Sequence, residues 1–179
     1  MTPDLDLAFR LAQGSDGAQA VFAYCRDGIN QAALSLLTTA SVYDLDNMRS
    51  RRVWTDDAAA YPAGNFKRLD QNRFFDLVIE GRQPFHSTTI EEIAEVFFDW
   101  EKIQALGFES NLNLPAVCND RVIGTINLLN QKGFYTPERV AAVMRWQPVA
   151  TLAFLLLQQN TRIGNFHGDL EGETGAMEG

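Results

Sequence analysis

Four polar side chains share one face of a predicted hairpin in the second half of the chain. In "ESNLNLPAVCNDRVIGTINLLN" (109–130), Asn111, Asn113, Thr125 and Asn127 occupy odd positions, and the even positions of 112–118 and 122–128 are small or apolar. Side chains alternate along a strand, so the polar four lie together. Amides are disfavoured in mid-strand and need partners when buried. They must therefore face water, a closed polar network, or a ligand that uses their uncharged donors and acceptors.

The rest of the sequence offers little for catalysis or metal binding. Cys25 and Cys118 are the only thiols, and both fall on apolar faces of predicted elements, which is typical of buried structural cysteines. His86 has no second base or acid close by in sequence. We find no Gly-rich phosphate loop and no Ser/His/Asp set. We therefore predict no catalytic residues and no metal ligands, and the sequence names no cofactor.

Length and composition indicate one globular domain, or one domain with terminal extensions. The chain has 179 residues, 46% of them hydrophobic, and a net charge of -8, which argues against a nucleic-acid partner. The one basic cluster, "RSRR" at 49–52, is interpreted as decoration of an exposed strand. No apolar run approaches the roughly 20 residues that span a bilayer. The acidic start lacks a signal-peptide pattern, so we expect a cytoplasmic protein without a membrane partner.

The hairpin must be positioned by elements predicted on either side of it. Before it, helical spacing covers 4–13 and 18–28, period two covers strands at 34–43 and 48–54, and 55–71 is expected to be a loop. A short helix at 72–80, a strand in "QPFHS", and a helix from a Thr88–Glu91 capping box to Gly107 follow. The last helix begins at Pro137 and is expected to kink at Pro148. This order indicates an α+β fold with an antiparallel sheet.

The segment "LPAVCNDRVIGTINLLNQKGFYTPERVAAV" resembles the end of GAF domains, in which an apolar strand with Pro and a V-I-G strand precede the final helix. Element order extends the resemblance to residues 16–160, with motif-level similarity over 109–160. It implies a stand-alone, bacterial-type GAF protein with a GAF/PAS-like fold. Its central antiparallel sheet of five to six strands would have terminal helices on one face and a pocket roofed by helices and loop on the other. Residues 1–15 would form a preceding helix and 161–179 a disordered acidic tail.

The resemblance also places the polar face of the hairpin toward that pocket. Aromatic residues of the middle segment would complete the site, and the amides would suit a small planar or zwitterionic ligand. The expected ligand-binding residues are Thr39, Ser41, Tyr43, Phe66, Phe75, Phe98, Asn111, Asn113, Thr125 and Asn127.

Three known GAF activities fit this sequence poorly. Free methionine-(R)-sulfoxide reductases and bilin-binding GAF domains both use a cysteine in the middle segment, and residues 26–117 contain none. The cyclic-nucleotide pattern lacks its Asp, because Pro137 stands there. The resemblance therefore implies a small-molecule-sensing signalling domain without catalysis. The alternatives are a protein–protein interaction module with a vestigial pocket and an enzyme related to the sulfoxide reductases.

The terminal helices carry more apolar surface than one domain needs. Beyond the core stripe of helix 4–13, Leu7 and Leu11 form a second apolar edge, and Leu155 and Leu156 lie beside the core-facing residues of the last helix. GAF domains resemble one another in pairing through such helices. We therefore expect a two-fold homodimer, with residues 1–15 in the contact.

Overall fold

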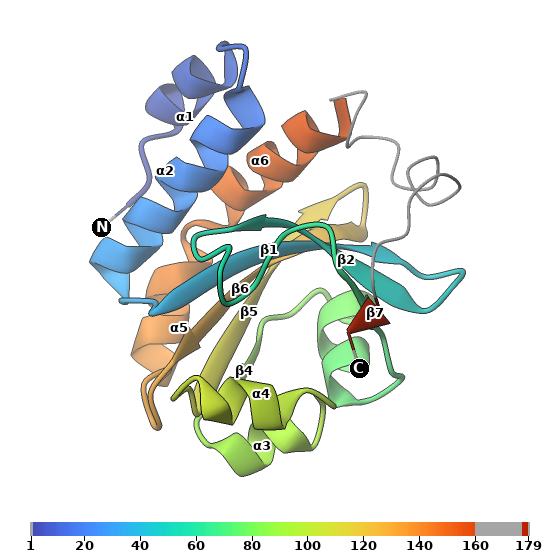
Figure 1. The fold of residues 1–179 in the computed structure, drawn as a ribbon. Coiled ribbons are helices and arrows are strands. Elements are labelled where there is room, and N and C mark those ends of the chain that lie inside the picture. The colour runs from blue at the N-terminus through green and yellow to red at the C-terminus, as the bar shows by residue number, and fades with distance from the viewer. Residues whose placement is uncertain (1, 160–176, 179) are drawn as a thin grey trace.

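The computed structural model describes residues 2–159 and 177–178, which form an α+β domain (Figure 1). The helices are α1 (Leu5–Ala12), α2 (Gly17–Ala32), α3 (Ile90–Ala94), α4 (Trp100–Ala105), α5 (Pro137–Met144), α6 (Gln147–Gln159) and a π-helix, η1 (Phe75–Glu80). The strands are β1 (Leu37–Asp44), β2 (Arg49–Thr55), β3 (Phe66–Arg68), β4 (Phe85–Ser87), β5 (Ser110–Cys118), β6 (Arg121–Asn130) and β7 (Met177–Glu178).

One curled antiparallel sheet organises the domain. Its strand order is β4-β5-β6-β1-β2-β3, and β7 pairs with the far side of β3 in parallel. The β5–β6 hairpin is closed by Asn119 and Asp120, both with positive φ, which is the turn chemistry expected of "CNDR". The predicted α+β sheet of five to six antiparallel strands is confirmed by β1–β6. Apart from Met177–Glu178, the tail predicted at 161–179 lies outside the described residues.

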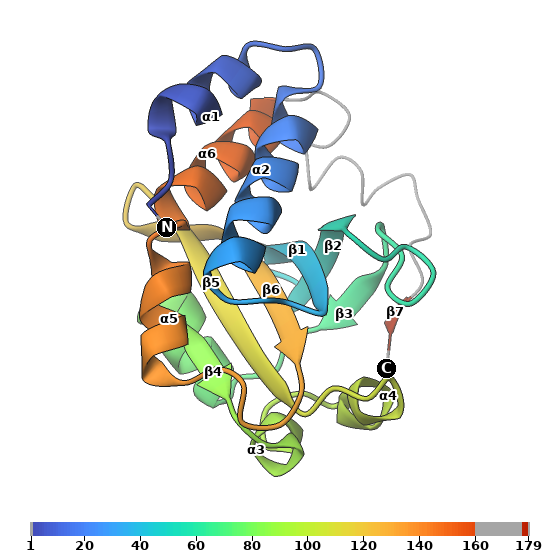
Figure 2. The same ribbon diagram turned by 90° about the vertical axis from the view of Figure 1, so that its left-hand side faces the viewer.

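The terminal helices cover one face of this sheet, as Figures 1 and 2 show. Even-numbered side chains of β5 and β6, among them Leu114 and Leu128, are fully buried with Phe22 of α2 and Phe154 of α6. The packing is close at Gly124, where a Cβ atom would lie 2.3 Å from the Phe154 ring. This face is therefore a dense apolar core.

The middle segment covers the opposite face. Helices α3 and α4 lie there (Figure 1), and η1 contacts β5 and β6. Two small apolar clusters hold this layer together, one around Phe74, Val78 and Phe85 and one around Ile93 and Ile103. The sheet is thus enclosed between a helical layer and a roof made of short elements.

Several predicted boundaries were wrong, mostly in the roof. The expected loop at 55–71 contains β3, a three-residue strand that forms by pairing with β2. The helix expected at 88–107 is two helices separated by residues 95–99. Its cap lies one residue later than predicted, because the Thr89 hydroxyl accepts from the Glu92 amide at 3.3 Å.

The first predicted strand also starts later than its sequence pattern. Leu34 and Leu36 were assigned to its apolar face, but both are exposed and precede β1. At the other end of the chain, the break expected near Pro148 is present as a 48° bend between α5 and α6. In the described part of the chain, no single helix is long and apolar enough to cross a membrane; only the bent α5–α6 pair reaches that length and composition.

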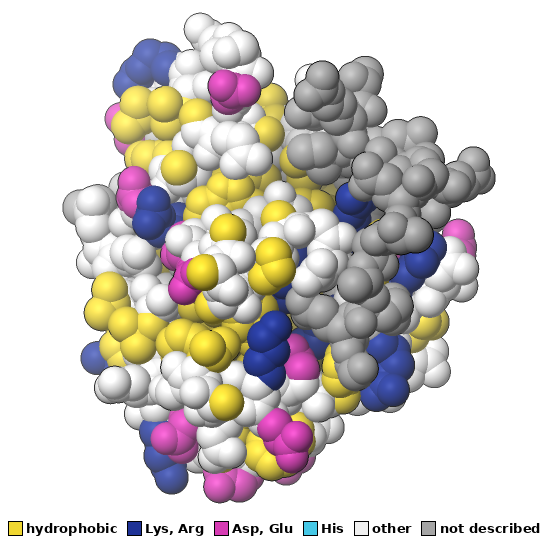
Figure 3. Space-filling view, viewed as in Figure 1, with side chains coloured by type: hydrophobic (Ala, Val, Ile, Leu, Met, Phe, Trp, Pro, Cys, Tyr) yellow, Lys and Arg dark blue, Asp and Glu magenta, His cyan; other side chains and the backbone are white. Residues whose placement is uncertain are grey.

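Helix α1 packs on a different face from the one predicted. Ala8 is buried, and Leu7 and Leu11 are half-buried rather than forming a free edge. Leu5 and Phe9, assigned to the core stripe, are instead 45% and 58% exposed. Hydrophobic side chains are visible over α1 at the upper left of Figure 3. Helix α1 therefore does have an exposed apolar surface, but Leu5 and Phe9 form it rather than Leu7 and Leu11.

Candidate functional site

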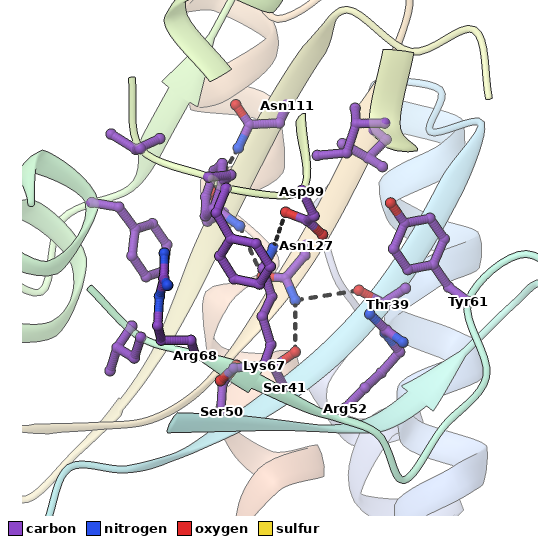
Figure 4. Close-up of a pocket in the computed structure, with 18 of the residues that line it drawn as sticks. Thr39, Ser41, Ser50, Arg52, Tyr61, Lys67, Arg68, Asp99, Asn111 and Asn127 are labelled. Atoms are coloured by element: carbon purple, nitrogen blue, oxygen red, sulfur yellow. Dashed lines mark hydrogen bonds and ion pairs between the residues drawn. The ribbon is translucent and has the colours of Figure 1, made fainter. Parts of the chain in front are cut away.

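A cavity of about 100 Å³ lies between the odd-numbered face of the sheet and the roof (Figure 4). It is smaller than the roughly 300 Å³ at which pockets for drug-sized ligands begin, so only a small molecule fits. The predicted site residues that line it are Thr39, Ser41, Tyr43, Phe98, Asn111, Asn113 and Asn127. The alternation of side chains along β1, β5 and β6 therefore predicted correctly which of their residues line the sheet side of this cavity.

Asn111, Asn113 and Asn127 form a continuous hydrogen-bonded row across β5 and β6. The Asn111 amide donates to Asn113 Oδ1 at 2.7 Å, and the Asn113 amide donates to Asn127 Oδ1 at 2.8 Å. Asn113 and Asn127 are direct partners in the β5–β6 register, which brings their side chains together. Two amides on facing strands thus satisfy each other where neither could be buried alone.

Asn127 is the centre of this network and extends it to β1. Its Nδ2 donates to the hydroxyls of Thr39, at 3.3 Å, and Ser41, at 3.1 Å. Its Oδ1 accepts a second bond, from Thr125 Oγ1 at 2.7 Å. Asn127 therefore uses both donors and both acceptor positions of its amide, and it joins three strands around the cavity.

Thr125 does not line the cavity, but it connects Tyr43 to the network. Its hydroxyl hydrogen goes to Asn127, so in the 2.6 Å contact with Tyr43 the tyrosine is the donor. Burial raises the pKa of Tyr43 above its ordinary value of 10.0, and the hydrogen bond to Thr125 offsets only part of that rise. Tyr43 therefore stays a neutral donor throughout the physiological range.

Charged residues that the sequence analysis did not select also reach the cavity. Lys67 of β3 and Asp99, which precedes α4, form an ion pair with 2.6 Å between Nζ and Oδ1. Arg52 was expected on an exposed strand, yet it is 7% exposed, lies over the Tyr61 ring and lines the cavity. The β1–β2 register shifts between Ala40 and Ser41, where Val53 of β2 has no partner. As a result Arg52 pairs with Ser41 and lines the cavity, whereas Trp54, two residues further on, stacks on Phe22 in the helical core.

The aromatic part of the roof differs from the prediction in two of three positions. Phe98 lines the cavity as expected. Phe66 instead lies beneath the guanidinium groups of Arg49 and Arg51, at 4.9 and 5.4 Å from its ring centroid. Phe75 is buried in the roof cluster and does not line the cavity, whereas its neighbour Phe74 does.

Structural comparison identifies the architecture that holds this cavity. The chain superposes on the GAF domain of a two-component sensor histidine kinase from Bacillus halodurans with a TM-score of 0.62, 11% identity, and coverage of 87% of this chain and 97% of that one. A GAF domain/HD domain protein from Geobacter sulfurreducens gives 0.62 at 13% identity, covering 84% and 97%. The blue-light absorbing PixJ GAF domain of Thermosynechococcus elongatus gives 0.57 at 14%, covering 88% and 95%.

The chain has a GAF-like fold. No protein-family model matches the sequence, and no curated protein matches it. The likeness thus lies in the three-dimensional arrangement, as expected from the hairpin and the element order. At these identities it establishes the fold alone.

Neither thiol of the GAF-like domain lies at the cavity. Cys25 is fully buried among the terminal helices, and burial raises its pKa to about 12. Cys118 was expected in the core, but it is half-buried at the tip of the β5–β6 hairpin, at an even-numbered position of β5. His86 of β4 is exposed. In the part of the chain that the structure describes, no three His, Cys, Asp or Glu side chains gather as a metal site.

Two buried acceptors at the GAF-like cavity remain without donors. Asp99 binds Lys67 through Oδ1, and its Oδ2 has no hydrogen-bond partner within residues 2–159 and 177–178. Asn111 Oδ1, at the end of the asparagine row, is likewise unpartnered among the described residues. Leaving a buried acceptor unpaired costs about 1–3 kcal/mol. The cavity is therefore polar and incompletely satisfied by the chain itself.

Proposed function

We propose that this chain is a ligand-sensing signalling domain that binds a small molecule in the cavity and catalyses no reaction of its own. The observation that carries the proposal is the amide and hydroxyl network on the cavity side of the sheet. Burying such groups is unfavourable unless each is paired. An unpartnered acceptor at the end of this network is the arrangement expected where a bound molecule completes it.

The comparisons support a sensory role through the fold. The similar structures come from a sensor histidine kinase, a GAF/HD protein and a light-absorbing GAF domain. A methyl-accepting chemotaxis protein segment is also similar, with a TM-score of 0.61 at 18% identity, covering 84% of this chain and 94% of that one. Those descriptions belong to the other proteins, and sharing their fold favours, for this chain, a regulatory domain over an enzyme.

The positions of the two cysteines argue against sulfoxide reductase chemistry. A thiol reductant must present a thiolate to its substrate. Cys25 is held as a thiol in the opposite core, and Cys118 lies at a hairpin tip. The interaction-module alternative remains distinct, because it requires no occupant of the cavity. Ligand occupancy is therefore the property that separates the two functions.

The decisive experiment is native mass spectrometry of the protein purified from cells. A bound small molecule should add mass to the wild type, and Ser41→Leu, which places a larger side chain in the cavity, should abolish that addition. Val42→Leu is the matched control, because the adjacent residue faces the helical layer. Wild-type protein free of any adduct, and unaffected by extracts of small metabolites, would favour the interaction module.

We further propose that the signal passes through a two-fold homodimer in which α1 contacts its counterpart. Leu5 and Phe9 are the exposed apolar residues of α1, and a helix apolar on an exposed side favours a second partner. In a two-fold interface the same patch meets itself.

Light scattering tests the assembly. The wild type should have twice the mass of one chain, Phe9→Glu should reduce it to one, and Arg10→Gln on the same helix should not change it. A wild type with the mass of one chain at micromolar concentration contradicts the dimer without affecting the ligand proposal.

A further inference from the structure

The groups left unsatisfied at the cavity specify the chemistry of its occupant. Both carboxylate oxygens of Asp99 are buried, with the side chain 9% exposed, yet only Oδ1 has a partner, Lys67. Asn111 offers a second free acceptor. This part of the cavity therefore needs hydrogen-bond donors.

The opposite end of the site offers donors instead. The hydroxyls of Thr39 and Ser41 both accept from the Asn127 amide, so each still has its own hydrogen to donate. Figure 4 shows Asn111 toward one end of the cavity, Thr39 and Ser41 toward the other, and Asp99 between them. A molecule that spans the site would meet acceptors at one end and donors at the other.

The charged side chains that line the cavity have partners within the chain. Arg52 donates to the Pro62 carbonyl at 2.8 Å and lies over the Tyr61 ring. Lys67 pairs with Asp99, and its ammonium lies 4.7 Å from the Phe97 ring centroid and 5.5 Å from that of Phe98. Arg68 makes two contacts with Asp70, at 2.9 and 3.0 Å. A charged occupant would have to break one of these pairs or remain uncompensated in a poorly solvated site. An uncharged occupant needs neither.

We propose that the cavity binds an uncharged molecule in which N–H donors flank a carbonyl, namely an amide, a urea or a cyclic ureide. Its N–H groups donate to Asp99 Oδ2 and Asn111 Oδ1, and its carbonyl accepts from Thr39 and Ser41. Flat ring atoms would lie against Phe97 and Phe98. This inference rests on the proposed ligand-sensing function, whose cavity it uses.

The test is titration of the ¹⁵N-labelled protein, following the side-chain amide signals of Asn111, Asn113 and Asn127. The probes are ethyleneurea, its N,N′-dimethyl derivative, guanidinium and acetate, which differ in N–H donors and in charge. Ethyleneurea should shift these signals saturably, with a dissociation constant of about millimolar for so small a molecule. The dimethyl derivative, which lacks N–H donors, should bind about tenfold more weakly or worse.

Each other outcome has a definite meaning. Equal binding of the dimethyl derivative, or tighter binding of guanidinium or acetate, would overturn the ligand class but leave the cavity as a ligand site. If none of the four probes moves the three signals, the inference falls. The proposed function then falls as well only if native mass spectrometry also finds no adduct.

Variants of the ion pair sharpen the test. Lys67→Met removes the cation that neutralises Asp99, so guanidinium should gain at least tenfold in affinity while ethyleneurea still binds. Asp99→Asn should weaken ethyleneurea binding in an otherwise folded protein, judged by its amide spectrum. Lys132→Met, an exposed position outside the cavity, should change neither. Unchanged guanidinium binding in Lys67→Met would show that Asp99 does not face the occupant.

Discussion

The two faces of the central sheet use the same strands for opposite purposes. On the helical side, Leu112, Leu114 and Ala116 of β5 are completely buried in an apolar core. On the roof side, the alternating residues Asn111 and Asn113 are also almost completely buried, but they lie in a polar network beside a cavity. Both faces of β5 are therefore buried, and the difference between them lies in what fills the space.

The helical face is stabilised by contact density. Phe154 of α6 meets β6 at a residue without a side chain, and Phe22 and Phe154 pack edge to face at 5.0 Å between centroids. Apolar packing of this kind leaves no room for an occupant and needs none. It provides the rigid layer against which the other face can be held in position.

The roof face is stabilised by fewer contacts, and each is directional. The asparagine row fixes the positions of its members, while the ion pair of Lys67 with Asp99 connects the edge strand β3 to the roof. Such a face has a definite geometry without being full. The two faces therefore differ in kind: the helical face supplies apolar packing, and the roof face supplies a directional polar network beside a cavity.

The largest expected effect is the cost of truncating the helical face. Leu114→Ala should destabilise the protein by about 2–5 kcal/mol, because it removes buried atoms and leaves a void. Asn113→Ala, the adjacent residue on the other face, should cost about 1–2 kcal/mol through lost hydrogen bonds. Urea denaturation of both variants measures the two values. Equal costs would contradict the assignment of stability to the helical face.

A smaller effect should appear within the polar network. Asn113 and Asn127 share a direct hydrogen bond, so their alanine variants should be non-additive, with a coupling of about 0.5–3 kcal/mol in a double-mutant cycle. The reference pair is Asn113→Ala with Lys132→Ala, which is exposed and should add within about 0.5 kcal/mol. Additive behaviour of Asn113 and Asn127 would mean that the row is not a cooperative unit.

The sequence predicted the sheet face well because a strand's period leaves little freedom. Once Leu112 and Leu114 are assigned to the core, Asn111 and Asn113 must face the other way. The same argument places Thr39 and Ser41 on β1, and the turn residues after Cys118 fix the hairpin register. These positions depend on local chemistry that a sequence displays.

The roof was predicted less well because tertiary contacts determine it. Strand β3 has three residues and exists by pairing with β2, which no local pattern reveals. Helix η1 has π-helical bonding, which does not follow the 3.6-residue spacing of an α-helix. The prediction therefore chose Phe75 for the cavity, whereas Phe74 lines it. Lys67 and Asp99 lie far apart in sequence, and only the folded chain brings them together.

The smallest expected effect concerns the hydroxyl of Tyr43, at the edge of the network. Tyr43→Phe removes a donor to Thr125 and should cost about 0.5–1.5 kcal/mol at neutral pH. The cost should depend on pH, because burial raises the pKa of Tyr43 in the folded protein while the unfolded chain ionises near the ordinary value of 10.0. Above that pH the unfolded wild type is stabilised by losing a proton that the folded wild type retains. The stability contributed by the neutral hydroxyl is therefore complete below pH 10 and is lost progressively as the pH rises through the folded pKa.

Phenylalanine cannot ionise, so the stability of Tyr43→Phe should fall less steeply above pH 10 than that of the wild type. The other tyrosines and both cysteines are present in both proteins, and their alkaline contributions cancel in the difference. Urea denaturation at several pH values from neutral to alkaline measures this difference directly. A gap between the two proteins that stays constant through pH 10 would mean that Tyr43 ionises as readily in the folded state as in the unfolded one. The roof would then admit water to the Tyr43 hydroxyl and its hydrogen bond with Thr125.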